Sequence, residues 1–373
     1  MTNKQRNNGI IRTSIIGIIG NIFLATSKII IAIIVSSASI LSDGLNNFTD
    51  SLGSIITIVG TKLSMKKPTK KHPFGFGRFE YITSTIIGFI ILAVGLTAVN
   101  DSIVSLIDYY SKGEKASFNL VSIIIVAVAI FVKLALAIIY KINAKRYNSL
   151  TLKGSGTDAF FDVILTSATL VSALVGFFFD FYIEGYVGLI IAGFIIKSGI
   201  QLIIEAMSQL LGKRLDSEFT NKLKQEIASI NGVMGVYDLI IHDYGNNKFI
   251  GSVHVGVANT LDVHEVQELE RAIQKEVYMK HGIIMTVGIY AQNRETEFSN
   301  KIRGRIFELI KDNKNVIQLH GFFVDEKDSY VSFDLVFSFD EKKPEEYVSQ
   351  IKEILQKEFK DLTFIINIDY DFA

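Results

Sequence analysis

Residues 10–35, IIRTSIIGIIGNIFLATSKIIIAIIV, form an apolar run that only two cations interrupt. A bilayer core about 30 Å thick is crossed by roughly 20 apolar helical residues, so this run is long enough to span a membrane. It is too long for the core of a signal peptide, which has about 7–15 apolar residues. We therefore predict a transmembrane helix here. Five similar stretches follow, at 38–65, 80–107, 119–144, 155–180 and 186–211.

Charge is divided unevenly along the chain. Residues 1–210 hold 18 Lys and Arg against 11 Asp and Glu, whereas residues 211–373 hold 20 against 27. This division indicates a membrane domain over residues 1–212, followed by a water-soluble acidic part. The chain has no Cys, which excludes disulfide scaffolds, thiolate metal sites and cysteine nucleophiles.

Cations gather in alternate loops of the six-helix pattern. Residues 62–78 carry six Lys and Arg and residues 141–153 carry four, whereas residues 36–39 and 181–185 carry none. Because cytoplasmic loops are rich in Lys and Arg, we expect both termini in the cytoplasm. We also expect the chain to lie in the lipid bilayer of the plasma membrane.

The soluble part contains an internal repeat. EFTNKL at 218–223 recurs as EFSNKI at 297–302, and AIQKEV recurs as ILQKEF 82 residues further on. Short strand-like runs between these helical segments give the order αββαβ twice. We predict an α+β cytoplasmic part of two tandem ferredoxin-like αββαβ units, at 213–292 and 293–373.

Two of the predicted membrane helices carry polar side chains that are costly there. Asn46 and Asp50 lie in one helix and Asp158 and Asp162 in another, each pair spaced i, i+4 and therefore on one helix face. A charged side chain at membrane depth costs about 2.5–3.5 kcal/mol on insertion scales. A divalent cation held between the two pairs would compensate this cost, and protons would do so in the empty site.

The chemistry of these four side chains favours a hard cation. One amide and three carboxylates offer only oxygen, which suits Mg²⁺, Ca²⁺ and Mn²⁺, whereas imidazole and thiolate suit Zn²⁺ and softer ions. No His lies in any of the six predicted spans. We therefore favour Mn²⁺ at this site.

Other charged residues in the predicted spans have simpler interpretations. Asp158 lies only a few residues into its span and has a helix cap as its alternative role. Asp43 is interpreted as a residue of the site's mouth or as a cap. For Lys133 we expect a side chain that snorkels toward a membrane interface.

The sequence resembles the cation diffusion facilitator family, specifically its manganese-exporting branch. The resemblance reaches to about residue 292 and is carried by DGLNNFTDS, HPFGFGRFEY, TDAFFDVILTS and GVYDLIIHDYG. The four polar side chains at 46, 50, 158 and 162 look like the manganese variant of the family's paired site. The resemblance implies a homodimer, a membrane site open alternately to each side, and exchange of the cation for protons.

The resemblance weakens in the basic loop and in the first soluble repeat. Many members have a second His where this chain has Phe76, so His72 lacks a partner in its motif. In the soluble repeat, His254 and His264 stand where zinc members place ligands. The other usual places hold Tyr237, Tyr290 and Gln292.

We therefore do not expect a complete cytoplasmic zinc site. A weaker metal site that uses His242, Asp243, His254 or His264 is an alternative, and so is a role for each His on a solvated strand face. The second repeat has His320 without a cluster of ligands, and we expect it to serve packing or dimerisation.

Together these features predict a secondary transporter that exports a divalent cation, most of all Mn²⁺, from the cytoplasm in exchange for H⁺. Mn²⁺ is then cargo, and we expect no prosthetic group and no nucleic-acid partner. The alternatives are Zn²⁺, Fe²⁺, Co²⁺ or Cd²⁺ by the same mechanism, a passive cation channel, or a metal sensor. An enzyme is not expected, because a phosphate-binding glycine loop, a nucleophile elbow and an HExxH motif are missing.

Overall fold

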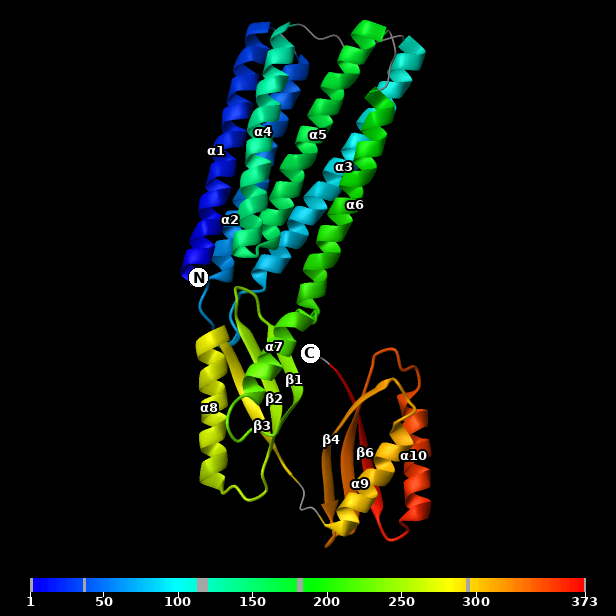
Figure 1. The fold of residues 1–373 in the computed structure, drawn as a ribbon. Helices are drawn as coiled ribbons and strands as arrows, with labels where there is room; N and C mark the ends of the chain where they lie inside the picture. Colours follow the sequence, from blue (N-terminus) through cyan, green and yellow to red (C-terminus); the bar gives the residue numbers. More distant parts are fainter. Residues whose placement is uncertain (1–2, 36–37, 113–119, 180–183, 293–295, 372–373) are drawn as a thin grey trace. The chain divides into compact units, whose positions relative to one another are not determined.

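A computed structural model describes residues 3–35, 38–112, 120–179, 184–292 and 296–371 (Figure 1). The chain divides into two compact units. The helical unit comprises Met1–Lys213 with Tyr244–Asn247, and the C-terminal unit comprises Arg214–Asp243 with Lys248–Ala373. Each unit is described separately.

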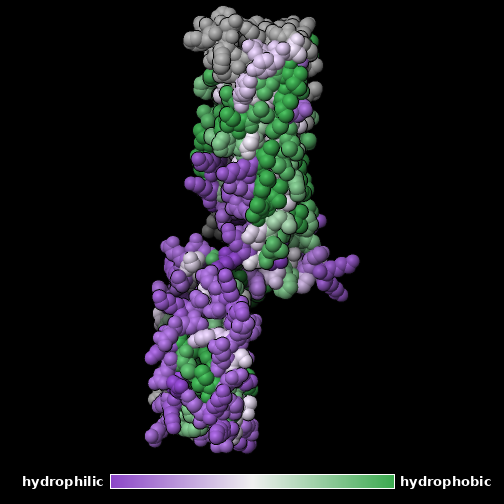
Figure 2. Space-filling view, turned by 90° about the vertical axis from the view of Figure 1, so that its right-hand side faces the viewer, coloured by the Kyte–Doolittle hydropathy of each residue, from purple (hydrophilic) through white to green (hydrophobic). Residues whose placement is uncertain are grey.

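Six long helices form the helical unit: α1 (Asn3–Val35), α2 (Ala38–Ser64), α3 (Phe79–Lys112), α4 (Leu120–Tyr147), α5 (Leu150–Phe179) and α6 (Glu184–Leu210). Within the described residues, α1, α3, α4 and α6 are long and apolar enough to cross a membrane. The helices α2 and α5 have 27 and 30 residues and carry the acidic pairs. Large apolar side chains such as Ile19, Phe131 and Ile190 are exposed on this unit, and Figure 2 shows a mostly hydrophobic face on it.

Glycines allow close approach of the membrane helices. A Cβ atom on Gly199 of α6 would lie 2.9 Å from the backbone nitrogen of Leu92 in α3. A Cβ atom on Gly17 of α1 would clash with the hydroxyl of Tyr140 in α4. Small residues at helix interfaces are typical of membrane bundles, because packing replaces the hydrophobic driving force there. The core between α3 and α6 contains buried isoleucines such as Ile91.

The C-terminal unit has the order αββαβ twice: α7 (Ser217–Ala228), β1 (Gly235–Asp243), β2 (Phe249–Val257), α8 (Val263–His281) and β3 (Ile283–Ala291), then α9 (Glu297–Ile310), β4 (Val316–Asp325), β5 (Tyr330–Phe337), α10 (Pro344–Glu358) and β6 (Thr363–Tyr370). In each three-stranded sheet the first two strands are antiparallel and the last two parallel. The predicted fold class, a helical membrane domain followed by two α+β units, is confirmed.

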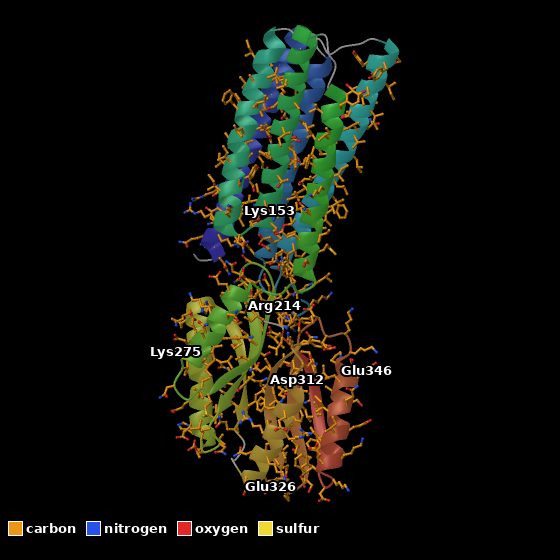
Figure 3. All side chains as sticks on the ribbon, turned by 45° about the vertical axis from the view of Figure 1, so that its right-hand side comes forward. Lys153, Arg214, Lys275, Asp312, Glu326 and Glu346 are labelled. Carbon is orange, nitrogen blue, oxygen red and sulfur yellow. The ribbon has the colours of Figure 1, made fainter. Side chains whose placement is uncertain are left out.

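The amphipathic helices of each repeat cover the apolar face of their own sheet. Leu223 of α7 and Ile273 of α8 are fully buried with Val255 of β2, and α9 and α10 pack in the same way in the second repeat. Charged side chains such as Lys275 and Glu346 project outward (Figure 3). The opposite faces of the two sheets carry polar side chains.

Strand pairing relates the two repeats residue by residue. Tyr237 of β1 pairs with His254 of β2, and His320 of β4 pairs with Asp334 of β5. His320 is therefore the structural counterpart of Tyr237, and Asp334 that of His254. Sequence similarity in the helices predicted the repeat, but this correspondence depends on strand register.

Candidate functional site

Three carboxylates converge inside the helical unit. Asp50 of α2 and Asp158 and Asp162 of α5 each place one oxygen so that all three oxygens lie within 4.8 Å of one another. The i, i+4 spacing on α5 puts both of its carboxylates on one face, and that face is turned toward Asp50. The arrangement is what a multivalent cation needs, because three anions at this spacing repel one another unless a positive charge lies among them.

The fourth residue of the predicted set, Asn46, lies one helical turn before Asp50 in α2. Its side chain lies outside the described part of the structure, as does that of Asp43. The roles of Asn46 as a ligand and of Asp43 as a mouth residue therefore stay predictions.

Lys133 of α4 is part of this site, which the sequence interpretation missed. Its Nζ atom lies 2.6 Å from Oδ2 of Asp50 and 2.6 Å from Oδ2 of Asp162, and only 7% of its side chain is exposed. The expected snorkelling of Lys133 toward an interface is therefore wrong. The available signal was depth: Lys133 stands in the middle of a long apolar run, where an ammonium needs an internal counter-charge.

A small enclosed cavity of about 20 Å³ adjoins the carboxylates, which is room for about one water molecule. Asn21 of α1 and Ser155 of α5 line it, and the side-chain oxygens of both are buried without a hydrogen-bond partner. Tyr140 and Ser54 also line it and are joined by a 2.7 Å hydrogen bond between their hydroxyls. A buried polar atom without a partner is costly, so these oxygens are suited to solvate an ion or a water beside the carboxylates. Nothing in their sequence spacing distinguished Asn21 or Ser155.

Charge balance defines what this site can hold. When ionised, the three carboxylates and the Lys133 ammonium have a formal charge of −2, and the buried Lys28 of α1 also acts electrostatically on Asp50. Lys133 neutralises this site only in part, because it contributes one positive charge against three negative ones. The carboxylates thus outnumber the lysines beside them, which favours a bound cation.

The other residues considered as metal ligands are dispersed. His72 is exposed in the loop after α2, with its ring 4.8 Å from that of Phe76. His242 is exposed on β1, and His264 is 78% exposed on α8, beside Glu268. In the described residues, none of His72, His242, Asp243 and His264 belongs to a group of three or more ligating side chains.

His254 differs from these residues, because its Nδ1 atom lies 2.7 Å from Oδ2 of Asp238. The structure therefore does not assemble the weak cytoplasmic site that was considered from His242, Asp243, His254 and His264. It surrounds Asp238 with other side chains, including residues of the second repeat.

Two family models match the chain. Residues 14–211 match the cation efflux transmembrane domain. Residues 215–289 match the cytoplasmic domain of cation efflux proteins. The first match alone covers more than half of the chain.

Several curated proteins are similar over most of their length. An uncharacterized transporter of Methanocaldococcus jannaschii, MJ0449, is 29% identical over 70% of this chain and 91% of its own length. The manganese efflux system protein MneS of Bacillus subtilis is 26% identical over 72% of this chain and 91% of its own. A cadmium, cobalt and zinc/H⁺-K⁺ antiporter of the same organism is 22% identical over 80% of this chain and 94% of its own.

Proposed function

The chain belongs to the cation efflux, or cation diffusion facilitator, family, and on this premise we propose that it exports Mn²⁺ from the cytoplasm in exchange for protons. It is a multi-pass membrane transporter with a cytoplasmic C-terminal domain. The observation that carries the proposal is the convergence of Asp50, Asp158 and Asp162 from two helices within 4.8 Å.

The choice of Mn²⁺ rests on ligand chemistry. Asp50, Asp158 and Asp162 offer oxygen only, with Asn46 as the proposed amide ligand, and no His lies in the membrane helices. Such a set suits a hard cation better than Zn²⁺. Similarity to two manganese efflux proteins of Bacillus subtilis supports the same choice.

A second candidate is export of Zn²⁺, Cd²⁺ or Co²⁺ by the same site. Similarity to the cadmium, cobalt and zinc antiporter favours it, since that relative covers a larger share of the chain than MneS does. The two candidates differ in the ion that competes best for the carboxylates, not in mechanism.

The proposed mechanism uses Lys133 as an internal counter-charge. In the metal-free site its ammonium, 2.6 Å from both Asp50 and Asp162, keeps these carboxylates together and partly neutralised. An incoming Mn²⁺ neutralises the negative charge that remains on the carboxylates. After Mn²⁺ is released, protons from the outer side bind the carboxylates in its place. Alternation of the site between the two faces would couple the two flows.

The assembly completes the proposal. We propose a homodimer in the plasma membrane with both termini in the cytoplasm. The match of residues 215–289 to the family's cytoplasmic domain and the cation-rich loops at 62–78 and 141–153 support this arrangement.

The test is Mn²⁺ flux in vesicles reconstituted with the purified protein, with and without an imposed pH gradient. We expect Mn²⁺ uptake coupled to proton counter-flow, and at least a tenfold loss in Asp162→Asn. Asp101→Asn, which changes an exposed acid of α3, is the matched control and should transport normally. Flux in Asp162→Asn equal to wild type would refute the proposed site, and downhill flux without proton movement would indicate a channel. Parallel runs with Zn²⁺, Co²⁺ and Cd²⁺ decide between the candidate ions.

A further inference from the structure

A second group of ligating side chains lies in the C-terminal unit, remote in sequence from the membrane carboxylates. His320 of β4, Asp334 of β5 and Asp369 of β6 come from the second repeat, and Asp238 of β1 comes from the first. The expectation that the second repeat holds no cluster of ligands is therefore wrong. Sequence spacing does not predict this cluster, because its members are dispersed over more than 130 residues and come together only through strand register.

The distances within the cluster are those of donors around one ion. Nε2 of His320 lies 2.6 Å from Oδ1 of Asp238, 3.7 Å from Oδ2 of Asp334 and 4.0 Å from Oδ2 of Asp369. Metal–ligand bonds of about 2.0–2.2 Å place two donors roughly 3–4 Å apart. Asp238, His320 and Asp369 each place one ligand atom within 4.8 Å of the others, and Asp334 lies beside them.

The His320 ring is buried and lacks hydrogen bonds. Its side chain is 1% exposed, and neither Nδ1 nor Nε2 has a hydrogen-bond partner. The nearest acceptor is Oδ1 of Asp238, whose 2.6 Å contact with Nε2 is an ion pair rather than a hydrogen bond of good geometry. Buried imidazole nitrogens are nearly always satisfied, so this ring is arranged for a partner other than a simple hydrogen-bond acceptor.

Each carboxylate of the cluster has one oxygen held by the protein and the other turned toward His320. The holding groups are the Tyr290 hydroxyl, 2.9 Å from Oδ2 of Asp238; the Asn367 amide, 2.6 Å from Oδ1 of Asp334; and the Tyr370 backbone N–H, 2.7 Å from Oδ1 of Asp369. Metal ligands are typically oriented by such outer contacts. The Tyr290 hydroxyl also lies 3.3 Å from Oδ2 of Asp334, so it bridges Asp238 and Asp334. One oxygen of each carboxylate lies nearest to His320.

The backbone supports this geometry in both repeats. Asp238 has a φ of 52° and Gly321, which follows His320, has a φ of 63°, at equivalent irregularities of β1 and β4. A positive φ is uncommon for a residue other than glycine, and at Asp238 it accompanies a carboxylate aimed at the second repeat. Strain of this kind is retained where a site depends on it.

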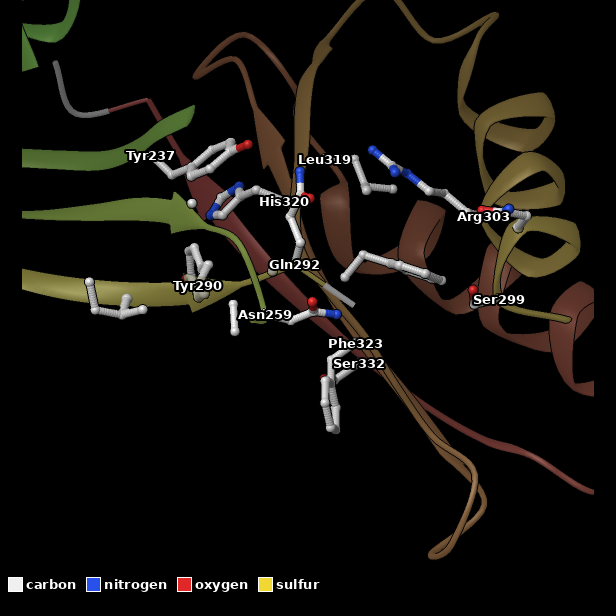
Figure 4. A pocket seen from close by; sticks show the side chains of 16 residues that line it. Tyr237, Asn259, Tyr290, Gln292, Ser299, Arg303, Leu319, His320, Phe323 and Ser332 are labelled. Carbon is white, nitrogen blue, oxygen red and sulfur yellow. The ribbon is translucent and has the colours of Figure 1, made fainter. Parts of the chain in front are cut away.

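A cavity of about 640 Å³ that both repeats line borders the cluster at His320. Figure 4 shows Tyr237 and His320 beside each other at its wall. The two rings are stacked, with their centroids 5.3 Å apart. Tyr290 lines the same cavity. The buried His320 ring therefore lies behind the wall of this cavity.

Protonation is the alternative way to balance the charges. Burial lowers the pKa of His320, but Asp238, Asp334 and Asp369 outweigh it and raise this pKa above its usual value. His254, whose Nδ1 atom lies 2.7 Å from Oδ2 of Asp238, is a second imidazole beside these carboxylates. Burial, together with contact with Asp238, correspondingly raises the pKa of Asp369.

We propose that Asp238, His320, Asp334 and Asp369 bind one divalent transition-metal cation, and that this cation fastens the second αββαβ repeat to the first. One imidazole among carboxylates suits Mn²⁺, Fe²⁺, Co²⁺ or Zn²⁺ better than Mg²⁺ or Ca²⁺. Three of the four ligands lie beyond residue 289, where the match to the family's cytoplasmic domain ends.

The test is equilibrium dialysis of the full-length protein in detergent against Zn²⁺ alone. Asp162→Asn serves as the background, because it weakens the membrane site. We expect this background to bind one Zn²⁺ per chain at the cytoplasmic cluster and to bind it at least tenfold more weakly when His320→Gln is added. His264→Gln, which changes an exposed His of α8, is the matched control and should bind as the background does.

Thermal unfolding provides a second readout on the same proteins. Zn²⁺ should raise the unfolding temperature of the background and of His264→Gln but not of His320→Gln, since a ligand stabilises only the state that binds it. Asp369→Asn, whose side chain is 29% exposed, repeats the test at a position more tolerant of change. Unchanged Zn²⁺ affinity in both His320→Gln and Asp369→Asn, or no Zn²⁺ bound by the background, would overturn the site. Dialysis measures binding without flux, so the result is independent of the proposed transport.

Discussion

The ammonium of Lys133 lies 2.6 Å from a carboxylate oxygen of Asp162, inside a bundle of apolar helices. It lies equally near Asp50, so one cation from α4 joins the two helices that carry the acidic residues. This relationship makes Lys133 a component of the ion site, because removal of its charge would take away the ammonium that contacts two of the three carboxylates.

Lys133→Met should therefore make the protein dependent on metal. The substitution keeps an unbranched side chain of similar length but leaves buried carboxylates unpaired, which costs about 3–5 kcal/mol for a buried pair. We expect a lower unfolding temperature without metal and a larger rise on addition of Mn²⁺ than in wild type. Lys197→Met, at an exposed position of α6, is the control. If Lys133→Met unfolded like wild type with and without Mn²⁺, Lys133 would not be the counter-charge.

Asn46→His should shift ion preference toward Zn²⁺. The substitution introduces an imidazole one turn before Asp50, and imidazole suits Zn²⁺ better than Mn²⁺. Competition between Mn²⁺ and Zn²⁺ in reconstituted vesicles should show a lower ratio of Mn²⁺ to Zn²⁺ transport. The same substitution at the exposed Ser111 of α3 should leave the ratio unchanged. An unaltered ratio in Asn46→His would contradict the assignment of Asn46 as a ligand.

A buried ion pair holds the N-terminal end of α1. Nη2 of Arg6 lies 2.7 Å from Oε1 of Glu80, and the two side chains are 3% and 5% exposed. Glu80→Gln should lower the free energy of unfolding of the helical unit by about 3–5 kcal/mol, because it leaves a buried guanidinium without its anionic partner. Glu358→Gln breaks the exposed pair with Arg305 and should have a much smaller effect, because solvent screens exposed ion pairs. Equal effects of the two variants in chemical denaturation would show that burial does not govern the Arg6–Glu80 pair.

The contact between α3 and α6 should be sensitive to a single methyl group. A Cβ atom at Gly199 would lie 2.9 Å from a backbone atom of α3, whereas one at Gly193 in the same helix meets nothing within 4 Å. Gly199→Ala should destabilise the protein by about 1–3 kcal/mol through overpacking, and Gly193→Ala should not. Unfolding temperatures in detergent provide the comparison, and a loss in Gly193→Ala as large as in Gly199→Ala would argue against helix contact as the cause.

Local pattern was sufficient for the helices and for part of the candidate site. The apolar stretches predicted the long helices because a bilayer requires a minimum length of apolar residues. The i, i+4 spacing of Asp158 and Asp162 placed both carboxylates on one face because helix geometry relates such residues directly. Similar helices at 218–223 and 297–302 were sufficient to predict the second αββαβ unit.

The partners of these residues depended on three-dimensional packing. A charge in an apolar helix indicates that a counter-charge is needed, but not which helix provides it. The position of Lys133 beside Asp50 and Asp162 follows from the packing of α4 against α2 and α5. Asn21 and Ser155 became part of the site only as neighbours of one cavity. The spacing of Asn21 and Ser155 in the chain does not predict that they lie close together.

The amino-acid pattern thus determined which segments are helices or strands, which end of the chain is water-soluble, and which acids are out of place in a membrane. These properties follow from periodicity and polarity over a few neighbouring residues. Tertiary structure alone decided that Lys133 faces Asp50 and Asp162, and that His320 meets Asp238 across two repeats. Such pairings depend on helix rotation and strand register, which are set by the packing of the whole unit and not by any local stretch of residues.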